Sequence, residues 1–445
     1  MTLPRYPKYK ISEVSWLGEV PEHWEVVQSR RLFSQRKERA RPTDKQLTAS
    51  QEHGVIFQDD FMEREGRSVM QVIHGADILK HVEPRDFVIS MRSFQGGLEW
   101  CGERGCISSA YVMLTPSQKI EPRFFRYLFK SQRYIQALQS TTNLVRDGQA
   151  LRFENFTLLD LPYLQSEEQL AIADFLDSEL GKIDALVEEQ RRLIELLKEK
   201  RQAVISHAVT KGLNPNTSMK DSGIEWLGPV PAHWHVKPLK FLIGRNGLIR
   251  GPFGGDLKKE IFQESGIKIY EQKNAIYRDA HLGDSYISES KFADMARFRV
   301  SEGDYIMSCS GTIGKAFRLP EGAPTGIINQ ALLIIRFSDC LCYQFANWVF
   351  ESSFFTEQIL DNSQGGAMKN LVGLGVFTSI ALPVPPITEQ QSIGCHLSTK
   401  AAKLDALIVE ATHAIDLLQE RRTALISAAV TGKIDVRGLA TEEAA

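Results

Sequence analysis

The sequence predicts an α+β fold in which two similar strand-rich globular domains are separated and joined by two long helices. The helices are expected to form an antiparallel intramolecular coiled coil, which makes the chain a tandem repeat with pseudo-twofold symmetry. Three observations predict this fold: a nine-residue motif that occurs twice, short apolar runs between turn residues in each half, and a long amphipathic stretch without proline after each set of runs.

The repeat begins at residues 16–24, Trp-Leu-Gly-Glu-Val-Pro-Glu-His-Trp, which return as Trp-Leu-Gly-Pro-Val-Pro-Ala-His-Trp at residues 226–234, 210 positions later. Towards the end of the module the separation is 221 positions, because residues 203–210 match residues 424–431. Solenoid repeats are only about 20 to 50 residues long. The chain is therefore a duplication of a whole module, with insertions in the second globular half.

Strand-like sequence alternates with helical sequence, and this alternation sets the expected domain limits. Runs of β-branched and aromatic residues between Gly, Pro and Asp indicate strands, and one amphipathic helix is expected in each globular half, around residues 122–139 and 342–360. The predicted parts are a first globular domain at residues 1–163, a first helix at 164–213, a second globular domain at 214–383, a second helix at 384–437 and a disordered tail at 438–445.

Both long helices carry apolar residues in alternating steps of three and four, which is typical of a coiled-coil seam. One such stripe is more often the buried face of an ordinary core helix, but two matched copies favour the coiled coil. Each helix would extend about 50 Å over about 35 residues and hold the globular domains at a fixed separation. Arg201 and Arg422 are matching polar interruptions. The seam residues are Leu176, Leu180, Ile183, Val187, Ile194, Leu197 and Val204 in the first helix and Leu397, Leu404, Ile408, Ile415, Leu418 and Leu425 in the second.

The composition is that of a soluble globular protein, with 53 Lys and Arg against 55 Asp and Glu and a net charge of −2. This balance excludes a histone-like basic protein and an acidic disordered one. Residues 1–163 carry 23 basic and 20 acidic side chains, whereas the helical residues 164–213 carry 7 and 10. We therefore expect nucleic acid at the globular domains and protein partners at the helices.

No apolar run approaches the roughly 18 residues of a membrane helix, so a cytoplasmic location and no membrane contact are expected.

Polar loops and one basic cluster are the candidates for contact with DNA. Loops that combine glycine with short donors and cations can approach phosphates and base edges. Ordinary β-turns and a solvated basic face are the competing interpretations. The candidates are Arg30, Arg31, Arg36 and Lys37 in the cluster, Arg92, Ser93, Gln95, Asn143, Arg146 and Gln149 in loops of the first domain, and Ser310, Thr312, Lys315, Gln364, Lys369 and Asn370 in loops of the second.

No catalytic or metal-binding motif is found. Residues 309–316 resemble a phosphate-binding P-loop, but Cys309 occupies the place of the first glycine and Ala316 that of the magnesium-binding Ser or Thr. His23 and His233 lie beside tryptophan in the repeated motif, where a packing role is favoured over acid–base chemistry. The six cysteines form neither a CxxC unit nor a cluster with histidine, so no metal site is expected.

This organisation resembles the specificity subunit of type I restriction–modification systems, which is named HsdS. The resemblance covers nearly the whole chain. It is carried by the repeated motif and by five further segments: Gly-Asp-Tyr-Ile-Met-Ser-Cys-Ser-Gly-Thr-Ile-Gly at 303–314, Ile-Asn-Gln-Ala at 328–331, Glu-Gln-Gln-Ser-Ile at 389–393, Leu-Asp-Ala-Leu at 404–407 and Ala-Leu-Ile-Ser-Ala-Ala-Val-Thr-Gly-Lys-Ile at 424–434. The first module departs from the pattern, with Arg-Ser-Phe-Gln-Gly at 92–96 and Ser108-Ser109 in place of Asn329-Gln330.

The resemblance implies a non-catalytic subunit that reads a bipartite site in double-stranded DNA, one target recognition domain per half-site. It also implies two modification (methyltransferase) subunits and restriction (translocase and nuclease) subunits as partners. S-adenosylmethionine, ATP and Mg²⁺ are then expected on those partners, with no cofactor in this chain. The acidic helices and the tryptophan motifs are candidate docking surfaces. Two other hypotheses remain: a clamp or scaffold that binds DNA without sequence preference, and, disfavoured by the missing motifs, an enzyme in its own right.

Overall fold

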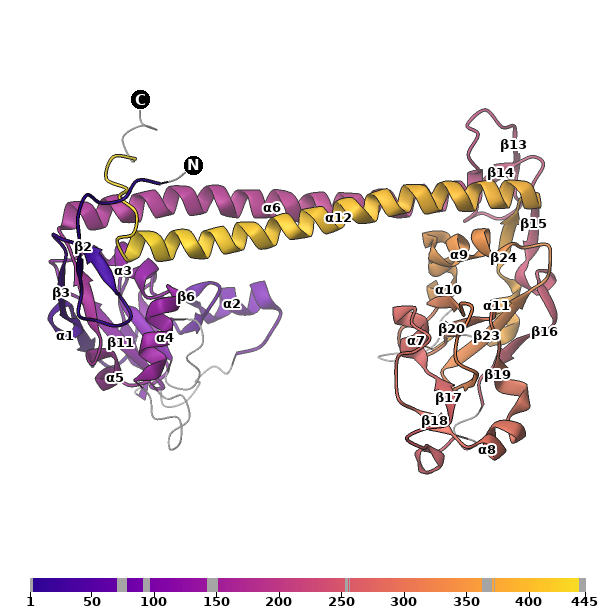
Figure 1. Ribbon diagram of the computed structural model, residues 1–445, viewed down its shortest axis with the longest axis horizontal. Coiled ribbons are helices and arrows are strands. Elements are labelled where there is room, and N and C mark those ends of the chain that lie inside the picture. Colours follow the sequence, from indigo (N-terminus) through magenta and orange to yellow (C-terminus); the bar gives the residue numbers. More distant parts are fainter. Residues whose placement is uncertain are drawn as a thin grey trace. The chain divides into compact units, whose positions relative to one another are not determined.

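The computed structural model describes residues 3–69, 78–90, 97–141, 151–252, 255, 257–361, 370–371 and 373–439. The chain forms two compact units. The first contains Met1–Gln190 and His413–Ala445, and the second contains Arg191–Thr412. Each unit holds one globular domain and part of both long helices, α6 (Ser166–Lys211) and α12 (Ile387–Val430) (Figure 1). Of the tail predicted at 438–445, residues 440–445 lie outside the described residues, and Leu439 packs against the core of the first unit.

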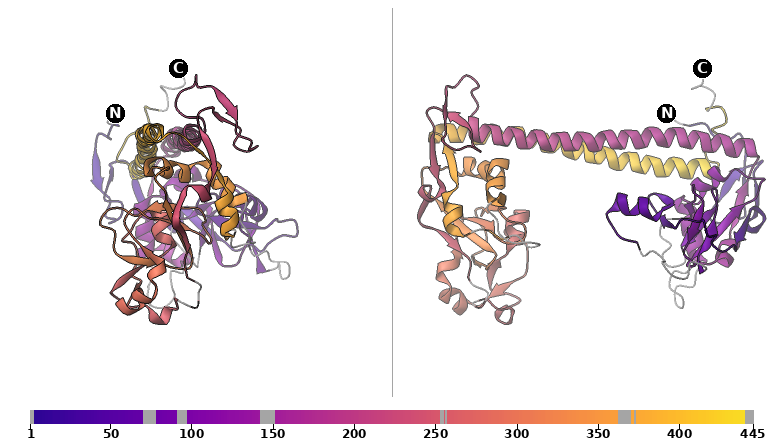
Figure 2. Two further views of the ribbon diagram at one scale, coloured as in Figure 1. Left: turned by 90° about the vertical axis from the view of Figure 1, so that its right-hand side faces the viewer. Right: turned by 180° about the vertical axis from the view of Figure 1, so that it is seen from behind.

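The long helices pair in opposite directions. In the first unit the beginning of α6 packs with the end of α12, and in the second unit the end of α6 packs with the beginning of α12. Within each unit the segments of the two helices lie side by side (Figure 2). All thirteen predicted seam residues are buried or half-buried, with Leu176 and Leu397 fully buried. The predicted antiparallel intramolecular coiled coil is confirmed.

Two matching ion pairs join the helices. The Arg422 Nε lies 3.3 Å from the Asp184 Oδ1 in the first unit, and the Arg201 Nε lies 2.8 Å from the Asp405 Oδ1 in the second. The partners in one pair lie 221 positions from their counterparts in the other. Exposed ion pairs contribute about 0 to 1 kcal/mol. The arginines that interrupt the apolar pattern therefore specify the register of the antiparallel pair more than its stability.

The main sheets of the two globular domains have the same topology, antiparallel throughout. Their strands run in the orders β4-β11-β8-β9 and β16-β23-β20-β21. Since β8 and β20 carry the aligned sequences Phe-Val-Ile-Ser and Tyr-Ile-Met-Ser, the duplication extends to the fold. The strands are β4 (Phe33–Arg36), β11 (Tyr111–Pro116), β8 (Phe87–Ser90) and β9 (Glu99–Trp100), then β16 (Ile243–Arg250), β23 (Leu332–Phe337), β20 (Tyr305–Ser308) and β21 (Ala316–Arg318).

A second sheet in the second domain contains a parallel pair, β17 with β22, in the order β18-β17-β22-β19. The first domain places two antiparallel pairs in the same order, β6-β5 and β10-β7. Among the described residues, a parallel bridge between Gln46 and Cys106 joins the two pairs. The strands are β17 (Ile267–Tyr270), β18 (Tyr286–Ile287), β19 (Arg299–Val300), β22 (Gly326–Ile328), β5 (Leu47–Ser50), β6 (Gly54–Phe57), β7 (Lys80–Val82) and β10 (Gly105–Ile107). Helix α7 (Gln272–Tyr277) lies between β17 and β18, whereas residues 51–53 alone connect β5 to β6.

Small antiparallel pairs close each module. One pair in each holds the repeated motif, and another joins the strand after the motif to the strand before the long helix. These pairs are β1 (Tyr9–Ile11) with β2 (Glu19–Pro21) and β3 (Glu25–Gln28) with β12 (Asp160–Tyr163), then β13 (Met219–Asp221) with β14 (Pro229–Pro231) and β15 (His235–Pro238) with β24 (Ala381–Val384). Short helices complete the domains: α1 (Ser29–Leu32), α2 (Gln58–Glu65), α5 (Phe153–Thr157), α8 (Glu289–Asp294) and α11 (Leu374–Ser379), with 3₁₀ turns η2 (Leu239–Phe241), η3 (Lys259–Ile261) and η4 (Ala296–Phe298).

Each globular half has two helices where the sequence predicted one. They are α3 (Pro122–Leu128) with α4 (Gln132–Ser140) and α9 (Tyr343–Glu351) with α10 (Ser353–Asp361). A buried serine with extended backbone separates the members of each pair, and its hydroxyl donates to a carbonyl three residues back: Ser131 to Leu128 and Ser352 to Val349, both at 2.6 Å. This local hydrogen bond competes with helix continuation, so the single-helix prediction was wrong in both domains.

The repeated motif anchors the start of each long helix. In the first unit the Glu168 carboxylate accepts hydrogen bonds from the Trp24 Nε1 (3.0 Å) and the Tyr6 hydroxyl (2.8 Å) and lies 2.8 Å from the His23 Nε2. In the second, Glu389 accepts from the Trp234 Nε1 (3.1 Å). Trp24 and Trp234 are fully buried. Trp24 and Trp234 therefore pack inside the units and are not available as docking surfaces for partners, whereas Trp226 of the second motif is 40% exposed.

The next residue in each helix is a buried glutamine that binds the loop before the helix pair. The Gln169 Oε1 accepts from the backbone N–H of Glu121 at 2.8 Å, and the Gln390 Oε1 accepts from the N–H of Cys342 at the same distance. The Gln390 Nε2 also donates to the carbonyl of Cys340. The Glu-Gln dipeptide thus attaches two separate parts of each globular domain to the helix.

No helix in the described part of the chain is both long and apolar enough to cross a membrane.

Replacing Glu168 with alanine should lower the free energy of unfolding of the first unit by about 2 to 3 kcal/mol, because the buried Trp24 and Tyr6 donors lose their acceptor. Calorimetry would measure this as a lower-temperature transition. The matched control is Glu167→Ala, which removes an exposed carboxylate from the same helical turn and should leave the transition in place. An unchanged transition in Glu168→Ala would contradict the anchoring role.

Candidate nucleic-acid interface

In the second domain the structure joins two of the predicted loops. Ser310, two residues after β20, pairs with Asn370: its Oγ donates to the Asn370 Oδ1 at 2.7 Å, and the N–H of Leu371 donates to the carbonyl of Cys309 at 2.8 Å. Thr312, Lys315 and Asn370 are exposed. Side chains from loops about 60 positions apart therefore form one polar surface.

Two glycines give the first of these loops its shape. Gly311 and Gly314 have φ values of +64° and +80°, a region that L side chains rarely adopt. A Cβ on Gly314 would also lie 3.1 Å from the Ile359 side chain. The Ser-Gly-Thr-Ile-Gly sequence is thus required for a tight loop that exposes Thr312 and keeps Ile313 buried.

Two further segments reach the same end of the sheets. The Gln272 side chain, at the start of α7, donates to the carbonyl of Ser310. The N–H of Asn329 donates to the carbonyl of Tyr270 at 3.0 Å, and the Asn329 Oδ1 accepts from the N–H of Ala331. The Ile-Asn-Gln-Ala motif was a signal for Asn329, but nothing in the sequence singled out Gln272, whose contact depends on long-range strand pairing.

Several predicted residues lie outside the described part of the chain. They are Arg92, Ser93, Gln95, Asn143, Arg146 and Gln149 in the first domain and Gln364 and Lys369 in the second. Their proposed contacts stay predictions.

Arg36 has a structural position within the basic cluster. Its Nε and Nη2 donate to the two carboxylate oxygens of Asp86 at 2.6 and 3.1 Å, and its Nη1 donates to Glu38 at 2.7 Å. The hydrogen bond that Arg36 donates to Asp86 raises the pKa of the Arg36 guanidinium. In the second domain Arg336 makes the same bidentate contact with Asp304, at 2.8 and 2.6 Å. Arg336 belongs to β23, however, and not to β16, the strand equivalent to β4. The Arg36 charge is thus neutralised inside the domain, which favours stability over DNA contact as its role.

The other cations of the cluster are exposed. Within the described residues, Arg31 and Lys37 make no ion pair, and the Arg30 side chain donates only to Gln28, at 2.8 Å. Exposed cations of this kind can contact phosphate oxygens, which positions a protein on DNA without reading its sequence.

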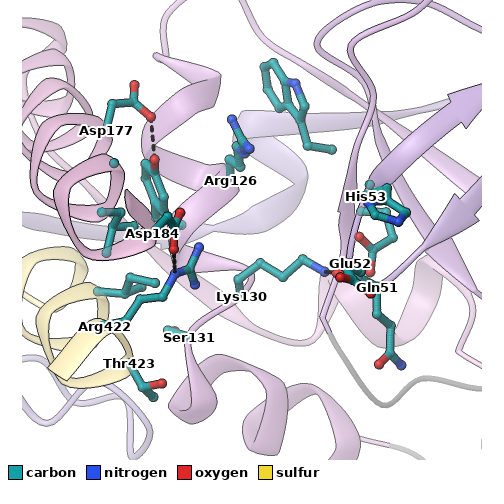
Figure 3. A pocket seen from close by; sticks show the side chains of 17 residues that line it. Gln51, Glu52, His53, Arg126, Lys130, Ser131, Asp177, Asp184, Arg422 and Thr423 are labelled. Carbon is teal, nitrogen blue, oxygen red and sulfur yellow. Dashed lines mark hydrogen bonds and ion pairs between the residues drawn. The ribbon is translucent and has the colours of Figure 1, made fainter. Parts of the chain in front are cut away.

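A polar cavity of about 550 Å³ lies in the first unit between α3, the turn at 51–53 and the long helices (Figure 3). Its walls mix charges: Lys130 pairs with Glu99 at 2.6 Å, and the Arg422 guanidinium faces Asp184. Because acids and bases balance one another there, the cavity is poorly suited to a phosphate. The cavity is lined in part by Gln51, Glu52, His53, Arg126, Lys130, Asp177, Asp184 and Arg422.

One group at the edge of this cavity has the residue types of a metal site. Single ligand atoms of Glu52, His53 and Glu65 lie within 4.8 Å of one another. The His53 Nε2 is 3.3 Å from the Glu65 Oε1, however, and Glu52 is exposed. An ordinary surface ion pair accounts for this geometry, so we assign the group no metal.

Comparison with known proteins places the fold. The chain is 23% identical over 436 residues to the type I restriction enzyme MjaVIII specificity subunit of Methanocaldococcus jannaschii, covering 94% of this chain and 95% of the relative. It is 22% identical over 364 residues to the EcoBI specificity subunit of Escherichia coli, covering 79% and 74%. The HsdS subunit from Thermoanaerobacter tengcongensis superimposes with a TM-score of 0.55 at 13% identity, covering 93% of this chain and 98% of that one. This chain is a relative of the type I specificity subunits.

A second solved chain, from work on complex assembly and conformational transition of the type I R-M system, has a TM-score of 0.62 at 14% identity and covers 92% of this chain and 98% of its own length. No protein-family model matches the chain. Because the similarity to specificity subunits spans both modules and both long helices, the resemblance inferred from the sequence is confirmed.

The Arg36→Met substitution should lower the free energy of unfolding of the first unit by about 3 kcal/mol, because the buried Asp86 carboxylate loses its cationic partner. Lys37→Ala is the matched variant on a neighbouring exposed cation. It should keep the thermal midpoint and reduce the slope of log affinity against log salt concentration by about one unit in a DNA-binding titration. The reverse pattern, a stable Arg36→Met protein with a reduced slope, would place Arg36 on DNA.

Proposed function

We propose that this chain is the DNA-recognition subunit of a type I restriction–modification complex and that each globular domain is a target recognition domain for one half of a bipartite site. The observation that carries the proposal is the surface formed by Ser310, Thr312, Lys315 and Asn370, where loops from distant parts of the second domain meet. The similarity to specificity subunits along both modules supports it.

The chemistry of that surface suits sequence reading. A threonine hydroxyl and an asparagine amide can donate to and accept from base edges in the major groove, where each base pair presents a distinct pattern. Lys315 supplies a cation for a phosphate. The Ser310 hydroxyl donates to the Asn370 Oδ1 and orients the amide, so its NH₂ group is free to point away from the loop.

The long helices provide matching surfaces for protein partners. Leu186 and Leu417 are 50% and 51% exposed in the first unit, and their counterparts 221 positions away, Leu407 and Leu196, are 47% and 53% exposed in the second. Exposed leucines on helices favour protein contacts. Two equivalent surfaces suit two copies of one partner, which supports two modification subunits beside the restriction subunits. Methyl transfer from S-adenosylmethionine and ATP- and Mg²⁺-dependent steps would then belong to those partners, with this chain non-catalytic.

A clamp that binds DNA without sequence preference is the alternative. The two proposals differ in competition binding by the complex with its modification subunits. A reader should be displaced by duplexes that carry its site far better than by scrambled duplexes at one stated salt concentration, whereas a clamp should be displaced equally by both.

Exchanging residues 15–161 with the matching segment of a relative that has a different target should change one half of the methylated motif and leave the other half and the spacing intact. Sequencing of methylated bases in cells that express the chimera would measure this. The control is the same exchange from a relative with an identical first half-site, which should keep the motif. If the first exchange leaves both halves unchanged in an active complex, the modular-reader proposal is wrong.

A further inference from the structure

In the second unit, helix α7 is tied to the long helix α6 through one acidic side chain. Glu351, at the end of α9, receives the Arg201 guanidinium of α6 at 3.0 Å on one carboxylate oxygen and the Arg278 guanidinium, at the end of α7, at 2.7 Å on the other. The Glu351 side chain is only 14% exposed. Arg201 in turn pairs with Asp405 of α12. A chain of ion pairs therefore runs from the paired long helices to α7.

The opposite end of α7 contacts the candidate reading loop. Gln272 donates its amide N–H to the carbonyl of Ser310, the residue that also binds Asn370. Between its ends, α7 packs against β20 and β21, the strands that flank this loop. The six-residue helix α7 thus connects Glu351 to the loop at 310–314.

The backbone of Arg278 indicates that its side chain is needed. Arg278 ends α7 in the left-handed conformation, with φ 54° and ψ 43°. Glycine or asparagine is preferred there, because other side chains are strained in that region. The ion pair with Glu351 gives a physical reason for an arginine at a position that favours glycine.

The described residues of the first module show no such connection. Lys130 occupies the position 221 residues before Glu351, so the charge is reversed, and it binds Glu99 and the carbonyl of Gln51 instead. Arg422, the counterpart of Arg201, pairs with Asp184. The three-residue turn at 51–53 stands in place of α7. Figure 3 shows Lys130 and Arg422 on the walls of the cavity at this junction.

We propose that Glu351 and Arg278 are positioning residues for DNA reading by the second domain. They hold α7 against the long helix and thereby fix the loop at 310–314 through Gln272, so discrimination in the half-site of the second domain depends on these two side chains while discrimination in the other half-site does not. This inference rests on the proposed function.

The test is Arg278→Gly in the assembled complex. Glycine suits the left-handed backbone, so the thermal midpoint should not fall, but the tie to Glu351 is lost. The probe is a duplex with the motif methylated in the host genome, compared with duplexes that have one base changed in either half. The measured quantity is the kcat/KM of methylation for the matched duplex divided by that for the changed duplex. When the changed base lies in the half-site that the module exchange assigns to the second domain, this ratio should fall by about tenfold. The ratio for the other half should stay unchanged.

Two further variants separate positioning from other roles. Arg85→Gly relieves a positive φ of 77° in the first domain and also removes one cation, and it should leave both ratios unchanged. Glu351→Gln should lower the same ratio as Arg278→Gly, although it removes the opposite charge. Unchanged discrimination in Arg278→Gly or in Glu351→Gln overturns the inference. A salt slope reduced by about one unit in Arg278→Gly also overturns it, because that arginine then contacts phosphate directly. If the wild-type complex methylates matched and changed duplexes equally, the proposed function itself has failed.

Discussion

At the start of each long helix, a glutamate carboxylate accepts hydrogen bonds from the repeated His-Trp motif, at Glu168 in the first unit and Glu389 in the second. The glutamine that follows binds the backbone of the same globular domain. Buried donors that lose their acceptor carry a large free-energy penalty, so each domain is held to its helix by groups that cannot easily be left unpaired. The direction in which a domain presents its loops is consequently set from the helix. A protein that reads two half-sites at a fixed spacing needs this constraint in both units.

The two modules share their main sheet and their anchoring to the long helices, but they differ in the side-chain contacts near the loops that would determine specificity. Both bury an aspartate against an arginine beside the central sheet, but the arginine comes from β4 in the first domain and from β23 in the second. Both place a charged residue at the end of the helix that faces the coiled coil, but Lys130 and Glu351 have opposite signs. A duplicated protein that must recognise two unlike half-sites can keep its frame and change the contacts that support its loops. The helix α7 is one such change.

The features that the sequence predicts well are those with a local or periodic signature. The duplication, both long helices and the seam from Leu176 to Leu425 follow from repetition and heptad spacing. The features it misses depend on pairing between distant residues. In the sequence, Arg36 is one cation of a basic run. It comes close to Asp86 only because β4 and β8 both pair with β11. The breaks at Ser131 and Ser352 depend on a single side-chain hydrogen bond. Ser310 and Asn370 were both expected to contact DNA, yet nothing in their spacing indicated that they touch each other.

The central claim is that two modules of one chain read the two halves of one DNA site. Sequencing of methylated bases in the host genome, with this gene present and deleted, tests it most directly. The account predicts a single bipartite motif, two specific half-sites separated by unread base pairs, that is methylated when the gene is present and unmethylated when it is deleted. Methylation of a continuous motif that depends on this gene, or a methylation pattern that its deletion leaves unchanged in cells that make the modification subunits, would contradict the account.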